Sequence, residues 1–162
     1  MDKSLEVRIG EGLQELSLTV SVAESCTGGL VGSRLTDVAG SSMYFLGGII
    51  AYSNDAKVKL LAVRRETLAT HGAVSEETAR EMAEGVRKSF GTDIGLAVTG
   101  IAGPGGATKD KPVGLMWLAL SAEEGIQTRL IRLTGDRLQN KAAGAEQLLS
   151  LLEEYINSLL TN

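Results

Sequence analysis

The sequence has little of several residue types on which common functional sites depend. It contains one cysteine, Cys26, and one histidine, His71, so it excludes an internal disulfide, a cysteine-based zinc site and a multi-histidine metal site. One tryptophan, three tyrosines and two phenylalanines leave few rings on which bases could stack. Sixteen basic against twenty acidic residues give a net charge of −4, which argues against a general nucleic-acid partner.

Long apolar runs are also missing. No stretch approaches the roughly 20 apolar residues that a membrane-spanning helix needs. Residues 1–13, MDKSLEVRIGEGL, alternate charged and apolar side chains and do not form the apolar core of a signal peptide. We therefore expect a cytoplasmic protein with no membrane partner. A chain of 162 residues is most simply one domain, here 1–162, and is long enough to bury a core without disulfides.

Glycine, by contrast, is abundant. The chain has 20 glycines, which is about 12% of its residues against a usual value near 7%. Many of them fall in clusters, at Gly28-Gly29, at Gly47-Gly48 and between Gly103 and Gly106. Such clusters predict turns and places where two backbone segments, or a backbone and a ligand, come close together.

Apolar runs alternate with amphipathic segments along the chain. We expect strands at 18–23, 43–52, 94–98, 113–120 and 127–133, and helices at 3–17, 30–40, 55–63, 64–71, 76–90 and from 137 to about 160. The run 43–52 is apolar on both faces and predicts an interior strand, and Asn54 is expected to cap the helix that follows. This order predicts an α/β fold, a three-layer α/β/α sandwich around a mixed, mostly parallel sheet of about five strands.

Three loops are expected to converge where strands end. They are 25–27 after the first strand, 52–57 after the second and 99–106 after the third. The glycine-rich third loop could bring backbone N–H groups to a phosphate or carboxylate. It lacks the Lys and Ser/Thr of a Walker A loop and the glycine spacing of a dinucleotide fingerprint. An ordinary surface loop would have the same composition.

Ser25 and Lys57 are the candidate reactive pair. Ser25 stands between a strand and a helix, where it could be a nucleophile or simply a helix cap. Nothing in the sequence directs His71 towards it, so a different base is needed, and Ser-Lys pairs supply one. Lys57 lies in the first turn of an expected helix, where the helix dipole and burial would lower its pKa. A solvated surface lysine is the alternative.

Other polar residues near Ser25 have less defined roles. Cys26 is a rival nucleophile, although free cysteine is most often a small buried apolar residue. Glu24 and Asp55 could orient other groups or exchange protons. No spacing identifies a pair of carboxylates.

Four blocks in order resemble the CinA C-terminal domain family over essentially the whole chain. They are SVAESCTGGL (21–30), GGIIAYSNDAKVKLL (47–61), GAVSEETAREMAEGVR (72–87) and GLAVTGIAGPGG (95–106), the last followed by KPVGLMWLAL (111–120). Family members characterised as enzymes are nicotinamide-nucleotide amidases. The larger N-terminal domain of full-length CinA proteins has no counterpart here, so the resemblance predicts a stand-alone version.

The resemblance implies an enzyme that hydrolyses the carboxamide of nicotinamide mononucleotide to nicotinate mononucleotide and ammonia, without a metal or other cofactor. It implies Ser25 as nucleophile, Lys57 as base and Tyr52 as a supporting residue. Amides of Cys26 and Thr27 would stabilise the oxyanion. The implied substrate contacts are Thr27, Gly28, Thr99, Gly100, Gly103, Gly105 and Arg137, with Arg137 suited to the phosphate.

The stretch after Arg137, LQNKAAG, lacks a further arginine expected in relatives. The resemblance and the apolar strands also imply a homodimer or higher homo-oligomer. Two other functions stay open at this point. One is a catalytically silent nucleotide-binding or regulatory module, and the other is a serine amidase for a different small amide.

Overall fold

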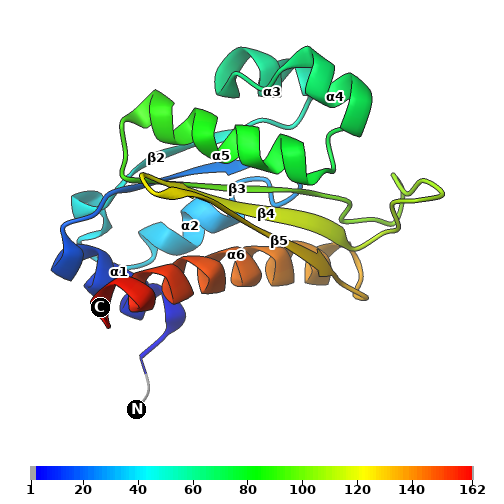
Figure 1. Cartoon of the computed structure of the whole chain (residues 1–162). Coiled ribbons are helices and arrows are strands. Elements are labelled where there is room, and N and C mark those ends of the chain that lie inside the picture. Colours follow the sequence, from blue (N-terminus) through cyan, green and yellow to red (C-terminus); the bar gives the residue numbers. More distant parts are fainter. Residues whose placement is uncertain (1–2, 162) are drawn as a thin grey trace.

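A five-stranded sheet lies between two layers of helices (Figure 1). The computed structural model describes residues 3–161. The strands are β1 (Val20–Glu24), β2 (Phe45–Ile50), β3 (Ile94–Gly100), β4 (Leu115–Ala122) and β5 (Gly125–Arg132). The helices are α1 (Leu5–Leu16), α2 (Leu30–Thr36), α3 (Asn54–Leu61), α4 (Arg65–His71), α5 (Glu76–Phe90) and α6 (Arg137–Leu160), with a 3₁₀ turn η1 (Ser41–Met43) before β2.

The strand order is β2-β1-β3-β4-β5. β1 pairs in parallel with both β2 and β3, whereas the β3–β4 and β4–β5 pairs are antiparallel. Four strands therefore point the same way and β4 alone is reversed. Helices α3, α4 and α5 cover one face, and α1, α2 and α6 cover the other (Figure 1). The predicted three-layer sandwich around a mixed sheet is confirmed.

The position predicted for the second strand is wrong. β2 is an edge strand, because it pairs with β1 on one side only, and it spans 45–50, not 43–52. Its neighbours Tyr44 and Ala51 are buried but lie outside it, so the apolar run is longer than the strand. The predicted helix cap is also shifted by one residue. Ser53, not Asn54, is the cap, and its hydroxyl accepts the N–H of Ala56 at 3.1 Å.

Each face of the sheet has its own apolar core. One core joins α1, α2 and α6 to the sheet and includes Ile9, Leu13, Leu148 and Leu152. The other core lies under α5 and includes Met82 and Val86 of that helix. β1 is buried along its whole length, which fits its mostly apolar sequence and requires partners for its two polar residues, Ser21 and Glu24.

Glycine allows α5 to lie close to the sheet. A Cβ on Gly95 of β3 would lie 2.2 Å from the carbonyl oxygen of Ala83, and one on Gly85 would lie 1.9 Å from that of Leu61. Any larger residue would push α5 away from β3 or α3. The helix that carries Lys57 therefore packs tightly beside the carboxyl ends of the parallel strands.

The register of the three parallel strands positions the functional loops. Glu24, the last residue of β1, lies opposite Ile50 on one side and Val98 on the other. The residues that follow these positions therefore meet at the carboxyl ends of the parallel strands, as predicted. The described helices include none that is both long and apolar enough to cross a membrane.

Candidate active site

Ser25 and Lys57 meet at the carboxyl ends of the parallel strands. Ser25 follows β1 directly, and its N–H donates to the carbonyl of Val98 at 3.1 Å, which anchors it to β3. Lys57 comes from the first turn of α3 and points back into the protein. Its Nζ lies 3.1 Å from the Oγ of Ser25. The structure thus brings together the two residues that the sequence identified as candidates.

Lys57 is a buried lysine without an acidic partner. Its side chain is 1% exposed, and its Nζ donates to the carbonyls of Ala51 at 3.0 Å and Tyr52 at 3.2 Å. Within residues 3–161, no carboxylate forms an ion pair with it. Burial therefore lowers the pKa of Lys57 below that of an ordinary lysine. The nearby Asp55 does not compensate, because it is exposed and contacts Arg65 at 3.2 Å.

The three neighbours of Nζ suit a neutral amine. An uncharged amine has two N–H groups and one lone pair. The carbonyls of Ala51 and Tyr52 accept the two N–H groups. The lone pair is then left for the third neighbour, the hydroxyl of Ser25. This geometry allows Lys57 to act as a general base towards Ser25.

Glu24 shapes the turn that carries Ser25. Its carboxylate is 2% exposed and accepts four hydrogen bonds, from the hydroxyl of Thr27 at 2.6 Å and from backbone N–H groups of the start of α2. The backbone donors are Gly29 (3.2 Å), Val31 (3.0 Å) and Gly32 (3.0 Å). The carboxylate is thus fully used inside the turn, so it holds the loop in place and does not face Ser25 as an acid or base.

Two backbone amides directly after Ser25 donate to no backbone carbonyl in the described part of the chain. The N–H of Gly28 donates to the carbonyl of Ser25 at 3.1 Å and is used within the turn. In the described part of the chain, no backbone carbonyl accepts the N–H groups of Cys26 and Thr27. These two amides are the ones available to an oxyanion that forms at Ser25.

Cys26 is unsuited to be the nucleophile. Its thiol is buried against Met116, with 3.8 Å between the two sulfur atoms. Burial raises the pKa of Cys26 to about 12. A thiol with this pKa stays protonated near neutral pH, so it lacks the thiolate that cysteine nucleophiles need.

Arg137 forms the outer wall of the site. It is the first residue of α6, where Asp136 and Gln139 form a capping box. Its guanidinium donates to the carbonyl of Gly103 at 2.7 Å and to the hydroxyl of Tyr52 at 3.2 Å. The Tyr52 side chain is exposed and reaches Arg137, whereas its backbone carbonyl contacts Lys57. Tyr52 thus contacts both basic residues of the site, Arg137 through its hydroxyl and Lys57 through its backbone carbonyl.

The glycine-rich loop is held in place from two sides. Thr99 is buried, and its hydroxyl donates to the carbonyl of Ala73 at 2.8 Å. Gly103 has a positive φ of 91°, and a Cβ there would lie 2.5 Å from a methyl of Val113, so only glycine fits. The loop projects from the end of β3, at the right of Figure 1.

Asn140 is a site residue that sequence reasoning missed. It lies on α6, is 1% exposed, and donates to the carbonyls of Ala102 at 3.1 Å and Gly135 at 2.9 Å. Its Oδ1 accepts the N–H of Gly135 at 3.0 Å. Asn140 therefore ties the glycine-rich loop to the start of α6. The signal in the sequence is its place on the apolar stripe of the last helix, four residues before Gly144 and eight before Leu148.

These residues surround a cavity of about 230 Å³. Nine of the predicted site residues line it, namely Ser25, Cys26, Tyr52, Lys57, Thr99, Gly100, Gly103, Gly105 and Arg137. Thr27 and Gly28 instead line a neighbouring hollow together with Leu138 and Lys141. His71 is not part of either lining; it is exposed, and its Nδ1 lies 3.6 Å from Glu77.

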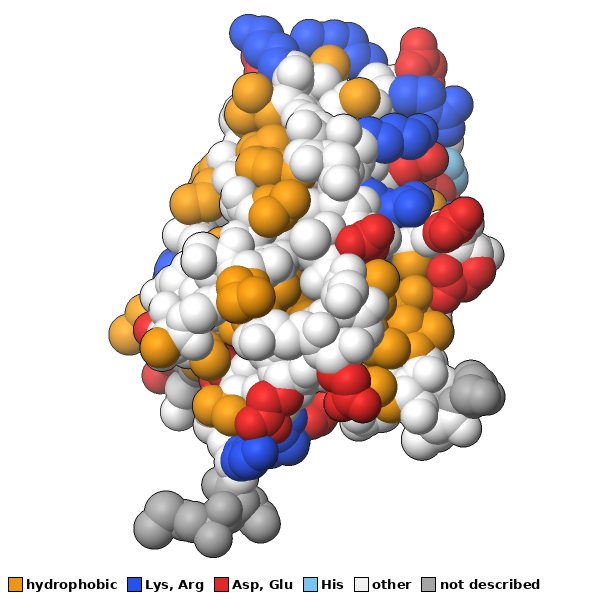
Figure 2. Space-filling model, turned by 90° about the vertical axis from the view of Figure 1, so that its left-hand side faces the viewer, with side chains coloured by type: hydrophobic (Ala, Val, Ile, Leu, Met, Phe, Trp, Pro, Cys, Tyr) orange, Lys and Arg blue, Asp and Glu red, His pale blue; other side chains and the backbone are white. Residues whose placement is uncertain are grey.

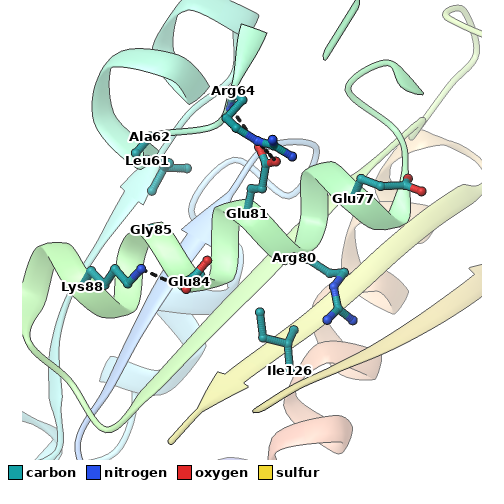
Figure 3. A pocket seen from close by; sticks show the side chains of 10 residues that line it. All are labelled: Leu61, Ala62, Arg64, Glu77, Arg80, Glu81, Glu84, Gly85, Lys88 and Ile126. Atoms are coloured by element: carbon teal, nitrogen blue, oxygen red, sulfur yellow. Dashed lines mark hydrogen bonds and ion pairs between the residues drawn. The ribbon is translucent and has the colours of Figure 1, made fainter. Parts of the chain in front are cut away.

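A larger groove of about 500 Å³ runs along α5, between the α3–α4 layer and Ile126 of β5 (Figure 3). Its charged side chains are paired: Arg64 contacts Glu81 at 2.9 Å, and Lys88 contacts Glu84 at 2.9 Å. Its lining has no serine, threonine or cysteine. The groove therefore has more room than the Ser25 cavity but no nucleophile.

Comparisons with known sequences agree over nearly the whole chain. A family model described as the CinA C-terminal domain matches residues 2–156. A CinA-like protein of Chloroherpeton thalassium is 49% identical over 161 residues, which cover 97% of this chain and 38% of that protein. A CinA-like protein of Kosmotoga olearia is 56% identical over 144 residues, covering 88% and 35%. The chain thus spans well under half of the length of these relatives.

Solved structures of similar sequence share the fold of this chain over nearly its whole length. The competence/damage inducible protein CihA of Agrobacterium tumefaciens is 43% identical with a TM-score of 0.91, covering 94% of this chain and 93% of that one. A CinA superfamily protein of Klebsiella pneumoniae is 34% identical with a TM-score of 0.92, covering 95% and 96%.

Proposed function

The chain belongs to the CinA C-terminal domain family, and from this premise we propose that it is a serine amidase that hydrolyses the carboxamide of nicotinamide mononucleotide. The products are nicotinate mononucleotide and ammonia, and the reaction needs only water as co-substrate. The observation that carries the proposal is the 3.1 Å approach of the Lys57 amine to the Ser25 hydroxyl inside a cavity.

The first half of the reaction transfers the acyl group to Ser25. Neutral Lys57 takes the hydroxyl proton as the Ser25 oxygen attacks the amide carbon. The negative charge that develops on the amide oxygen is met by the N–H groups of Cys26 and Thr27. Lys57 then passes its proton to the nitrogen, the C–N bond breaks, and ammonia leaves. An ester between Ser25 and the nicotinoyl group remains.

The second half releases the acid. Water enters the place that ammonia has left, and Lys57 takes one of its protons as the oxygen attacks the ester. Collapse of the second intermediate returns that proton to the Ser25 oxygen. Because the carbonyls of Ala51 and Tyr52 keep Nζ in one position, the same amine serves both halves.

Arg137 is proposed to hold the phosphate of the substrate. Its two present partners, the Gly103 carbonyl and the Tyr52 hydroxyl, are uncharged oxygens. A phosphate would offer the guanidinium stronger, charge-assisted hydrogen bonds. Tyr52 and the glycine-rich loop would then line the path between the phosphate and Ser25.

Ammonia release from nicotinamide mononucleotide by the purified chain tests the proposal. We expect ammonia and nicotinate mononucleotide in equal amounts from the wild type, and none from Ser25→Ala. Binding of the mononucleotide without release would contradict the proposal and favour a silent nucleotide-binding module. Equal release from nicotinamide riboside, which lacks the phosphate, would favour an amidase of different specificity.

A further inference from the structure

Among the described residues, no acidic side chain lines the Ser25 cavity. The chain has twenty acidic residues, and Figure 2 shows Asp and Glu beside Lys and Arg on the surface at the end of the molecule opposite the glycine-rich loop. The cavity lining includes two basic residues, Lys57 and Arg137, and its other side chains carry hydroxyl, thiol or apolar groups. A cation that enters the cavity therefore finds no carboxylate in the lining to balance its charge.

Acidic residues on the surrounding elements have partners of their own. Glu24 of β1 accepts four hydrogen bonds inside its turn, and Asp136 caps α6. Asp55 of α3 and Glu81 of α5 each form an ion pair with an arginine. Since each of these carboxylates is already used, none of the four serves as a counter-ion for Lys57.

The charge of Lys57 therefore depends on what shares the cavity with it. Within the described chain, its buried amine contacts uncharged oxygens alone, those of Ala51, Tyr52 and Ser25. The neighbouring thiol of Cys26 is uncharged as well, because burial raises its pKa to about 12. A further positive charge within about 4–6 Å of the amine would disfavour its protonated form, because like charges repel.

We propose that the positive charge of the substrate's own ring keeps Lys57 neutral, so that the cavity selects amides carried by a cationic ring. This inference rests on the proposed function. In nicotinamide mononucleotide the ring nitrogen bonds to ribose and carries a positive charge, and the carboxamide is attached to a nearby ring carbon. That carboxamide must reach the Ser25 oxygen, which lies 3.1 Å from Nζ of Lys57, inside a cavity of about 230 Å³. The ring charge thus comes close to the amine, and a protonated amine releases its proton to solvent when the substrate binds.

The product is expected to have the opposite effect on Lys57. Nicotinate mononucleotide has the same ring and phosphate, but a carboxylate replaces the carboxamide beside the amine. Its negative charge offsets that of the ring and favours the protonated lysine. Because ligand binding and proton release are linked, substrate affinity should rise with pH through the titration of Lys57, and product affinity should not. A neutral lysine thus favours the amide over the acid in the same cavity.

Titration of Lys57 in ligand complexes tests the inference. Ser25→Ala removes the nucleophile, so it holds the substrate without turnover, and it keeps the two carbonyl contacts of Nζ. The probes are nicotinamide mononucleotide, its reduced form with an uncharged dihydropyridine ring, and nicotinate mononucleotide, which all carry the same phosphate. In NMR of the lysine ε-carbons, Lys57 should lose its proton about one pH unit lower, or more, with the first probe than with the second, which is a tenfold change in proton affinity. With nicotinate mononucleotide it should lose its proton at a higher pH than with nicotinamide mononucleotide.

Val74 allows a matched test of the missing carboxylate. It lies in the turn before α5, is half-buried and lines the same cavity. Val74→Asp adds a carboxylate to the lining, whereas Val74→Asn adds a side chain of the same shape without a charge. Combined with Ser25→Ala, Val74→Asp should reduce the difference in proton affinity between the oxidised and reduced complexes to less than about threefold, and Val74→Asn should keep it.

The outcomes separate this inference from the proposed function. Equal titration of Lys57 with the oxidised and the reduced mononucleotide would overturn the inference, while ammonia release by the wild type would still support the amidase. A difference of the same size in Val74→Asp and Val74→Asn would overturn it as well, because the ring charge would then not act through the lack of a carboxylate. Failure of all these mononucleotides to bind Ser25→Ala would overturn the proposed function, and this inference with it.

Discussion

Two lysines in the helical layer of α3 and α5 have opposite surroundings. Lys88 lies in the larger groove, where Glu84 neutralises it at 2.9 Å (Figure 3). Lys57 lies in the smaller cavity, where it contacts two carbonyls and a serine hydroxyl. The first arrangement pairs the amine with a carboxylate, whereas the second buries the amine without one, lowers its pKa and aims it at a nucleophile. The buried amine without a carboxylate partner, not the volume of the hollow, therefore identifies the candidate site.

The strongest test of this contrast between Lys57 and Lys88 is to remove each amine in turn. Lys57→Met should reduce ammonia release by at least about 10³-fold, because loss of a member of a catalytic unit costs 10⁴–10⁶-fold in comparable hydrolases. Lys88→Met should leave the rate within about twofold, since its ion pair is on the surface. Comparable rates of ammonia release in the two variants would show that Lys57 is not the base.

The arginines of the two hollows give a second contrast. Arg137→Ala should raise KM for the mononucleotide about 10–100-fold, because a hydrogen bond to a charged group contributes about 1.5–3 kcal/mol. Arg64→Ala, in the groove, should leave KM unchanged, since Arg64 already pairs with Glu81. Steady-state kinetics with varied nucleotide measures both. An unchanged KM in Arg137→Ala would place the phosphate elsewhere.

Asn140 is expected to act through the loop that it holds. Asn140→Ala removes the contacts to Ala102 and Gly135 and should raise KM about tenfold, as the Gly103 carbonyl no longer holds Arg137 in place. A double-mutant cycle with Arg137→Ala should be non-additive, because the two residues act on one contact.

The matched control for Asn140 is Thr67→Val. Thr67 is another buried polar residue, and its hydroxyl contacts Glu81 beside the groove at 2.6 Å. This variant should lose stability without a change in KM. Additive effects of Asn140→Ala and Arg137→Ala would mean that Asn140 merely stabilises the fold.

The lowered pKa of Lys57 should make the stability of the protein depend on pH. The folded pKa of Lys57 lies below its unfolded value, so between the two values the unfolded chain binds more protons and stability rises with pH. Lys57→Met should therefore be more stable than the wild type at neutral pH, and its advantage should shrink as pH rises towards about 10.4. Lys88→Met, which removes the exposed i,i+4 ion pair with Glu84, should cost about 0.3–0.5 kcal/mol. Urea unfolding at neutral and alkaline pH measures both, and a pH-independent difference for Lys57→Met would contradict the buried-amine account.

Local pattern was enough to predict the loops that form the site. Val20–Glu24 and Ile94–Gly100 are mostly apolar because both faces of each strand are covered, so the predicted strands 18–23 and 94–98 end within two residues of the observed ones. Strand order has no such local signal. The position of β2 at the edge depends on which strands pair, and its apolar run indicated an interior strand.

Side-chain environments were harder to predict than backbone elements. The sequence around Lys57, NDAKVK, resembles an exposed helix start, and its burial depends on carbonyls of Ala51 and Tyr52 that only the tertiary fold supplies. Ser53 and Asn54 are equally suitable caps, so pattern could not choose between them. Asn140 was missed because its partners lie 38 and 5 residues away in the chain.

The direct measurement is the titration of Lys57 by NMR, with ¹³C at the ε-carbons of lysine and Lys57→Met to assign the signal. The account predicts that Lys57 loses its proton at a pH below the ordinary lysine pKa of about 10.4. A Lys57 signal that titrates at that ordinary value or above it would contradict the central claim, because the amine would then be fully charged where it must accept a proton from Ser25.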